Sequence, residues 1–187
     1  GACDMGALPS DYVGYRKVSD PETTAWFNDY YSAEGYEVNL PTTPGLTLVE
    51  MMNAAHAGDL KVLYIHGEDP VLSDADVQHT KEALANLEML IVQECFLTDT
   101  AQCADVVLPA AGWGEQEGTF TSGERRVQCL HKAQEPPEGA WLDWKIMEEI
   151  AVRMGVPRSI FHYETSEDIF NEIRECAPIM AGMNRER

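Results

Sequence analysis

The stretch "LKVLYIHGEDPVLSDADVQHTKEALANLEMLIVQECFLTDTAQCADVVLP", residues 60–109, decides the fold. Three short apolar runs, at 60–66, 89–93 and 105–109, are typical of buried β-strands. The first two enclose a segment with helical spacing at 74–87, for which Ser73 is the expected N-cap. Residues 96–104 leave room for a short helix before the third run. The alternation of strands and helices predicts parallel strands joined by right-handed crossovers.

Uniformly apolar strands indicate a sheet that is covered on both faces. We therefore expect an α/β fold, a three-layer doubly wound and mostly parallel sheet of the Rossmann-like kind. An added β-hairpin is expected where "GTFT" and "RRVQCL" flank "SGE".

Further helices are expected on both sides of this core. Residues 47–58 begin with a Thr47 and Glu50 capping box and end at Gly58. A second helix should follow Asp143 as its N-cap and stop at Gly155, and a third covers 166–176. The predicted division is a surface excursion over 1–45, an α/β core over 46–157 and a C-terminal helix and tail over 158–187.

The amino-acid composition of the chain argues against several classes of function. The 187 residues carry 13 Lys and Arg against 32 Asp and Glu, a formal charge of −19, which disfavours a nucleic-acid partner. No apolar run is long enough to span a membrane. The five cysteines form no CxxC pair, which argues against disulfides and a zinc site and favours a reducing, cytoplasmic compartment. Without an initial Met, the chain is expected to be the middle of a longer one.

Polar side chains follow each strand of the predicted sheet. Ligands of open parallel sheets bind beyond the carboxyl ends of the strands, so Asp69, Gln93, Glu94 and Gln116 should converge at one edge. Carboxylates can accept the N1 and N2 hydrogen bonds of a guanine. Each residue also has a structural alternative, because Asp69 before Pro70 is a common turn former and Glu94 could pair within the protein.

Other sequence motifs give weaker evidence for a binding site. "GWGEQEG", 112–118, has one residue more than the dinucleotide fingerprint and precedes an extended segment, so we reject a self-contained NAD site there. Arg125 and Arg126 are expected to hold the hairpin or a neighbouring domain. The histidines lack ligand spacing, which indicates solvated or packing roles and no metal site in this chain.

Several long motifs together resemble the central part of formate dehydrogenase catalytic subunits, in the molybdopterin oxidoreductase family. They are "GACDMGALP", "LYIHGEDPVLSD", "IVQECFLTDTAQCADVVLPAAGWGEQEGTFTSGERRVQ" and "DWKIMEEIAVRMG". The resemblance implies two molybdopterin guanine dinucleotides around molybdenum or tungsten, a nearby 4Fe-4S cluster, and oxidation of formate to CO2 with transfer of two electrons. The protein would supply position and electrostatics while the cofactor carries the chemistry.

By this resemblance, five residues touch the guanosine end of one dinucleotide: Asp69, Gln93, Glu94, Gln116 and Asp143. Glu94 stands where the family usually has Asp, and Gln116 where many relatives have Lys. No catalytic or metal-binding residue is expected in this chain, because the residues that bind the cluster and the metal should precede Gly1.

The implied partners are the remaining domains of the same subunit and electron-transfer subunits, and the fragment alone should be inactive. Two alternatives remain open at this point. The chain could be the equivalent domain of another molybdopterin enzyme, such as a nitrate reductase, a formylmethanofuran dehydrogenase or a respiratory-complex subunit. It could also be an interaction domain of the same fold that binds no ligand.

Overall fold

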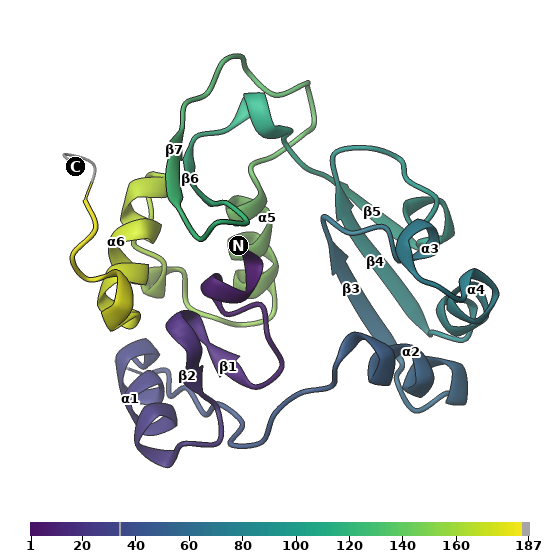
Figure 1. The fold of residues 1–187 in the computed structure, drawn as a ribbon, viewed down its shortest axis with the longest axis horizontal. Helices are drawn as coiled ribbons and strands as arrows, with labels where there is room; N and C mark the ends of the chain where they lie inside the picture. The colour runs from purple at the N-terminus through teal and green to yellow at the C-terminus, as the bar shows by residue number, and fades with distance from the viewer. Residues whose placement is uncertain (34, 185–187) are drawn as a thin grey trace. The chain divides into compact units, whose positions relative to one another are not determined.

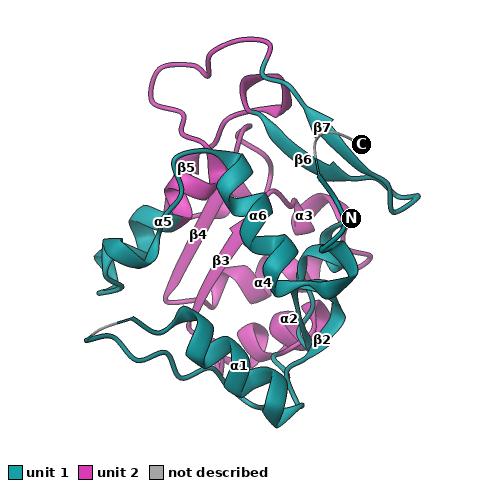
Figure 2. Ribbon diagram, turned by 90° about the vertical axis from the view of Figure 1, so that its left-hand side faces the viewer, with its two compact units in different colours: residues 1–45, 117–132, 148–187 teal, residues 46–116, 133–147 magenta. Residues whose placement is uncertain are grey.

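The computed structural model describes residues 1–33 and 35–184. The chain forms two compact units, which Figure 2 colours separately. Unit 1 consists of residues 1–45, 117–132 and 148–187, and unit 2 of residues 46–116 and 133–147. These units group the chain differently from the predicted ranges 1–45, 46–157 and 158–187, because the hairpin and most of the helix after Asp143 belong with the N-terminal segment.

Unit 2 contains the parallel sheet, in the order β3 (Val62–His66), β4 (Met89–Glu94) and β5 (Val106–Pro109). Its helices are α2 (Leu48–Ala57), α3 (Pro70–Ser73), α4 (Val77–Ala85), the 3-10 turns η3 (Ala101–Cys103) and η4 (Trp113–Glu115), and the first turn of α5 (Asp143–Arg153). Both strand pairs are parallel, which confirms the predicted pairing. The helix expected over 96–104 is reduced to the single turn η3.

The core of unit 2 lies between this sheet and helices α2, α3 and α4, which Figure 1 shows on one side of the strands. The buried side chains are Met52, Ala55, Leu63, Ile65, Val71, Ala83, Leu84, Leu90, Val92 and Ala101. The alternate residues point to the opposite face, where Val62, Met89 and Val106 are exposed. Within the described part of unit 2, the helices of the core therefore cover one face of the sheet.

Helix α2 follows the prediction closely. The Thr47 hydroxyl accepts from the Glu50 N–H, the Glu50 carboxylate accepts from the Thr47 N–H, and Gly58 ends the helix at a φ of 82°.

Two predicted caps were wrong. Asp76, and not Ser73, caps α4 by accepting from the His79 N–H, because residues 70–73 form the short helix α3 after Pro70. Asp143 is the first residue of α5 and lies inside the helix, so its carboxylate is directed to other partners.

Unit 1 combines the two ends of the chain with the hairpin. Its elements are η1 (Ala2–Met5), β1 (Asp11–Tyr12), η2 (Val13–Tyr15), β2 (Arg16–Lys17), α1 (Pro21–Tyr31), β6 (Gly118–Thr121), β7 (Val127–Leu130), the rest of α5, η5 (Arg158–Ile160), α6 (Ser166–Cys176) and η6 (Pro178–Met180). The antiparallel β6–β7 pair confirms the predicted hairpin. Residues 1–45 were expected as a surface excursion, yet Val18 and Phe27 are buried in this unit.

Helix α1 is fastened to α6 by side chains. The Tyr31 hydroxyl donates to Glu172 at 3.1 Å, and the Tyr30 hydroxyl donates to Glu175 at 2.7 Å. Arg125 donates from Nε to Asp4 at 3.0 Å and lies over the Tyr15 ring, so it holds the hairpin against η1 and η2 as expected.

Candidate functional site

The three parallel strands end side by side at one edge of unit 2. The register pairs His66 with Gln93, and Glu94 with Pro109, so the polar residues that follow the strands are brought to one place. Helix α5 begins at the same edge, because the Trp141 N–H donates to the Pro109 carbonyl and the Ala111 N–H to the Trp141 carbonyl. The register thus brings Gln93 and Glu94 to the same edge of the sheet as Asp143, the first residue of α5.

Asp143 is the centre of this cluster. Its Oδ1 accepts from Gln93 Nε2 at 2.6 Å and lies 3.0 Å from His66 Nε2. Burial would raise the pKa of the Asp143 carboxyl, but the hydrogen bonds from His66, Gln93 and Gln116 outweigh it, so the pKa is lowered. The Asp143 side chain is still 27% exposed, and an ionised acceptor therefore remains accessible at this edge.

Gln93 has a fully buried side chain whose two ends are both used. Its Nε2 donates to Asp143, and its Oε1 accepts from the Tyr64 hydroxyl. These two partners fix the orientation of the amide, since only the NH2 group can donate to a carboxylate. Gln93 therefore acts on this site by orienting Asp143, because its own side chain has no exposed surface.

His66 is a member of the cluster that the sequence reasoning missed. The hydrogen bond to Asp143 raises the pKa of His66, burial lowers it in part, and the charges of Asp143 and Glu94 add to the increase. Its position as the last residue before "GEDP" was the available signal, since the neighbouring strand ends supplied the predicted residues.

Asp69 joins the loops that follow β3 and β4. Its Oδ1 accepts from the Thr100 N–H at 3.1 Å and from the Thr100 hydroxyl at 2.5 Å, and that hydroxyl accepts from the Val71 N–H. Thr100 is fully buried, so these hydrogen bonds are shielded from water. The structural alternative that the sequence left open for Asp69 is thus realised, and it fixes the loop beside the site.

Glu94 faces the same edge as His66. Its Oε1 accepts from the Cys95 N–H at 2.8 Å and from the Cys95 thiol at 3.1 Å. Burial raises the pKa of the Cys95 thiol, and the hydrogen bond to Glu94 raises it further, which favours the protonated thiol.

Gln116 follows η4, and its side chain is one of the groups that lower the pKa of the Asp143 carboxyl. The glycine-rich stretch before it forms a 3-10 turn, in which the Gly112 N–H donates to Glu115 at 2.7 Å. The segment after it is the strand β6, so the helix that a dinucleotide fingerprint requires does not follow.

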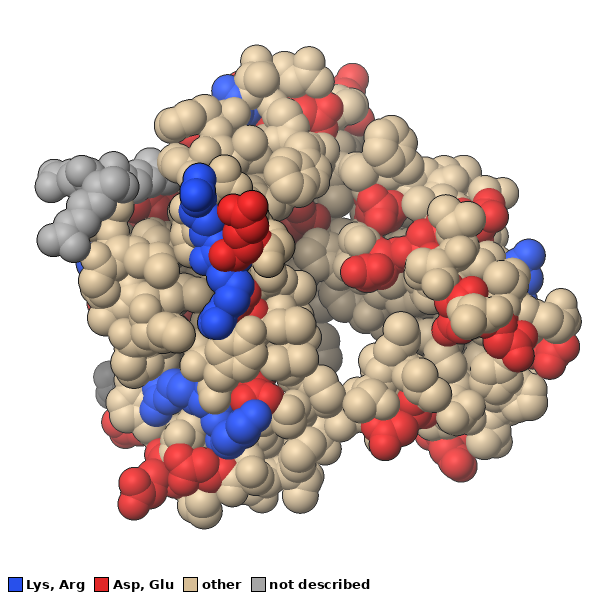
Figure 3. Space-filling view, viewed as in Figure 1, with Lys and Arg blue, Asp and Glu red and all other residues tan. Residues whose placement is uncertain are grey.

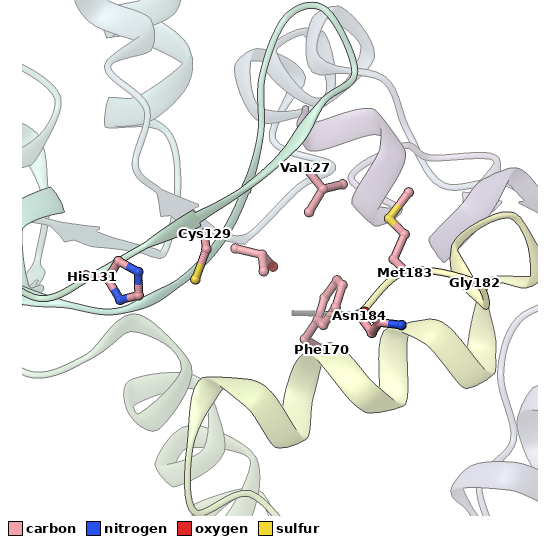
Figure 4. Close-up of a pocket in the computed structure, with 8 residues that line it drawn as sticks. Val127, Cys129, His131, Phe170, Gly182, Met183 and Asn184 are labelled. Atoms are coloured by element: carbon pink, nitrogen blue, oxygen red, sulfur yellow. The ribbon is translucent and has the colours of Figure 1, made fainter. Parts of the chain in front are cut away.

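A pocket of about 390 Å³ lies in unit 1. Figure 4 shows Val127, Cys129 and His131 of the hairpin on one side of it and Phe170 of α6 on another. None of the five predicted site residues lines it. Residues 1–33 and 35–184 contain no group of three or more His, Cys, Asp or Glu side chains that could hold a metal ion, and no helix there could cross a membrane.

Residues 1–153 match the family model described as molybdopterin oxidoreductase, and the chain therefore belongs to that family. Its relatives include the F420-dependent formate dehydrogenase subunit alpha of Methanocaldococcus jannaschii, which is 46% identical over 187 residues, and formate dehydrogenase H of Escherichia coli, which is 41% identical over 187 residues. The alignments cover 100% of this chain but 26% and 25% of those two proteins. The chain thus spans about a quarter of their length.

A solved structure, acetylene hydratase from Pelobacter acetylenicus, has a similar fold, with a TM-score of 0.59 over 74% of this chain and 19% of its own. The sequences are 22% identical, so this likeness concerns the fold alone.

Membership in the family implies a molybdopterin cofactor. At the sheet edge Glu94 and Asp143 offer carboxylate oxygens, which accept hydrogen bonds from N–H donors such as those of a guanine base.

Proposed function

We propose that this chain is a cofactor-binding part of a molybdenum or tungsten formate dehydrogenase, and that the carboxyl edge of its parallel sheet binds the guanine end of a molybdopterin guanine dinucleotide. The observation that carries the proposal is the Asp143 carboxylate, which is kept ionised at the strand ends by Gln93 and His66 while part of it stays exposed. Asp143 and Glu94 accept the N1 and N2 donors of the base, and Gln116 lies beside them.

The remaining residues of the site hold these acceptors in place. Gln93 orients Asp143 through its buried amide, and Asp69 fixes the adjoining loop through Thr100. When bound, the cofactor supplies the two-electron chemistry in which formate becomes CO2. The residues described here bind and orient its nucleotide.

The rest of the proposal concerns the longer protein. Two dinucleotides and a 4Fe-4S cluster are held with the help of other domains of the subunit, and electron-transfer subunits accept the electrons. Support comes from relatives that are named formate dehydrogenases and from the matching family model. The sheet of this chain then belongs to a doubly wound, three-layer domain whose second helical layer covers the face that carries Val62 and Met89.

The test compares two glutamates at opposite ends of β4 in the intact protein that contains these residues. Glu94→Ala should lower the molar content of guanine nucleotide released on denaturation. Glu88→Ala, which removes an exposed partner of Lys61 at the amino end of the strand, should leave it unchanged. Adenine nucleotide in place of guanine, or equal guanine content in both variants, refutes the site. An intact protein that reduces nitrate and does not oxidise formate refutes the assigned reaction.

A further inference from the structure

His66 lies at an open part of the strand edge. It is the last residue of β3, and Gly67 after it takes a φ of 64°, which turns the chain away from the strand. The space beside Gly67 is open, since a Cβ built there would meet no atom within 4 Å. The His66 side chain is 41% exposed, so a ligand at this edge can reach its ring.

The two ring nitrogens of His66 have different hydrogen-bonding roles. Nε2 is directed at Asp143, at 3.0 Å, and is the donor of that hydrogen bond because a carboxylate can only accept. Nδ1 is then an acceptor when the ring is neutral and an N–H donor when the ring is protonated. A proton on His66 therefore changes the kind of ligand atom that the second nitrogen can bind.

Positive charge is scarce around this ring. Unit 2 contains three lysines and no arginine, and Lys61 is paired with Glu88 at the amino end of the sheet. Lys145 lies over the Trp144 ring, and Lys81 is in the middle of α4. In Figure 3 acidic side chains are spread over the part of the molecule that carries the parallel sheet, and basic ones are sparse there.

We propose that His66 is a further ligand-binding residue of this edge, and that its protonated ring donates from Nδ1 to an acceptor oxygen of a guanine nucleotide. The inference rests on the proposed nucleotide site. The oxygen belongs either to the phosphates or to the O6 of the base, and both would be repelled by the lone pair of a neutral Nδ1.

The charged groups that face His66 favour the protonated ring. Asp143 on α5 and Glu94 on β4 both carry negative charge towards it, and together they raise the pKa of His66. Nucleotide binding should consequently take up a proton, and affinity should fall as the pH rises through the pKa of His66.

The experiment measures GDP and guanosine binding by calorimetry to the intact protein freed of its nucleotide, between about pH 5.5 and about pH 8.5, a range that spans histidine titration. For GDP, the dissociation constant of the unchanged protein should rise about three- to tenfold across this range, the size expected for one partly exposed charge contact. His66→Gln keeps a donor for Asp143 but cannot be protonated, so its affinity should not vary in this way. His79→Gln, at an exposed histidine bonded to Asn53, is the matched control and should keep the pH dependence.

The outcomes separate the two proposals. If the dissociation constant depends on pH for GDP and not for guanosine, the acceptor is a phosphate oxygen. If it depends on pH for both, the acceptor is O6 of the base. GDP binding with the same pH dependence in His66→Gln overturns the role of His66 and leaves the nucleotide site standing. No GDP binding by any variant overturns the site and His66 with it. As an independent check, bound GDP should raise the NMR-measured pKa of His66 by about half to one unit, because linkage is reciprocal.

Discussion

Replacing Gln93 by methionine removes a buried amide while nearly keeping the shape of the side chain. Three hydrogen bonds disappear: one to the ionised Asp143 carboxylate, a longer one of 3.4 Å to the Asp143 carbonyl, and one from Tyr64. A bond to a charged group contributes roughly 1.5–3 kcal/mol and a neutral one roughly 0.5–1.5 kcal/mol. The apolar methionine offsets part of this loss, about 1 kcal/mol, because its thioether is easier to bury than an amide. We expect Gln93→Met to lower the free energy of unfolding by about 1–3.5 kcal/mol.

The assay is urea-induced unfolding of the chain, followed by far-UV circular dichroism, with the free energy extrapolated to water. Gln78→Met is the matched control, because Gln78 on α4 is exposed and bonds only the neighbouring Glu82 on the surface. Its cost should be at most about 0.5 kcal/mol. If the two substitutions cost the same, or Gln93→Met costs less than the control, the buried amide does not hold the cluster together and the reasoning fails.

Three further predictions use the same measurement. Thr47→Ala should cost about 1 kcal/mol by removing one half of the capping box, and an equal cost for Thr47→Ser would contradict the capping role. Thr100→Val keeps the volume but removes a buried hydroxyl that Asp69 accepts from, so it should cost about 1–3 kcal/mol, and a loss below about 0.5 kcal/mol would argue against that bond. Since the folded pKa of His66 is raised and that of Asp143 lowered, their pair should add at most about 1 kcal/mol of stability between the two pKa values. This contribution is lost as the pH rises through the pKa of His66 or falls through that of Asp143. If the free energy of unfolding depends on pH in the same way in the unchanged chain and in His66→Gln, this prediction is contradicted.

Local signals predicted most elements of unit 2. Thr47 and Glu50 lie three residues apart and bond each other directly, so a sequence pattern is enough to find their capping box. The apolar runs predicted the three parallel strands for a similar reason, since β3 and β4 bury apolar side chains of their own and Val107 of β5 packs against them. Ser73 misled because three candidate caps, Ser73, Asp74 and Asp76, follow Pro70 closely, and the first of them is the last residue of the short helix α3 that Pro70 starts.

The positions of polar residues at the ends of the strands were the signal for the candidate site, whereas the hydrogen bonds between its side chains could not be predicted from the sequence. Gln93 and Glu94 could be named because polar residues directly after an apolar strand are unusual. The bond between His66 and Asp143 joins residues 77 positions apart, and no spacing rule reveals such a pair. Burial of Gln93 was likewise hidden, because it depends on the Tyr64 and Asp143 side chains meeting at its two ends.

The division into units also bears on the order in which the chain folds. Unit 2 draws its strands and their covering helices from one uninterrupted run, residues 46–116, so its nucleus needs only short loop closures. Unit 1 is assembled from three separated runs, and α1 finds its partner α6 only when residues 166–176 have been made. During synthesis we therefore expect the parallel sheet to form before unit 1, whose long-range contacts require residues 166–176 and should form more slowly.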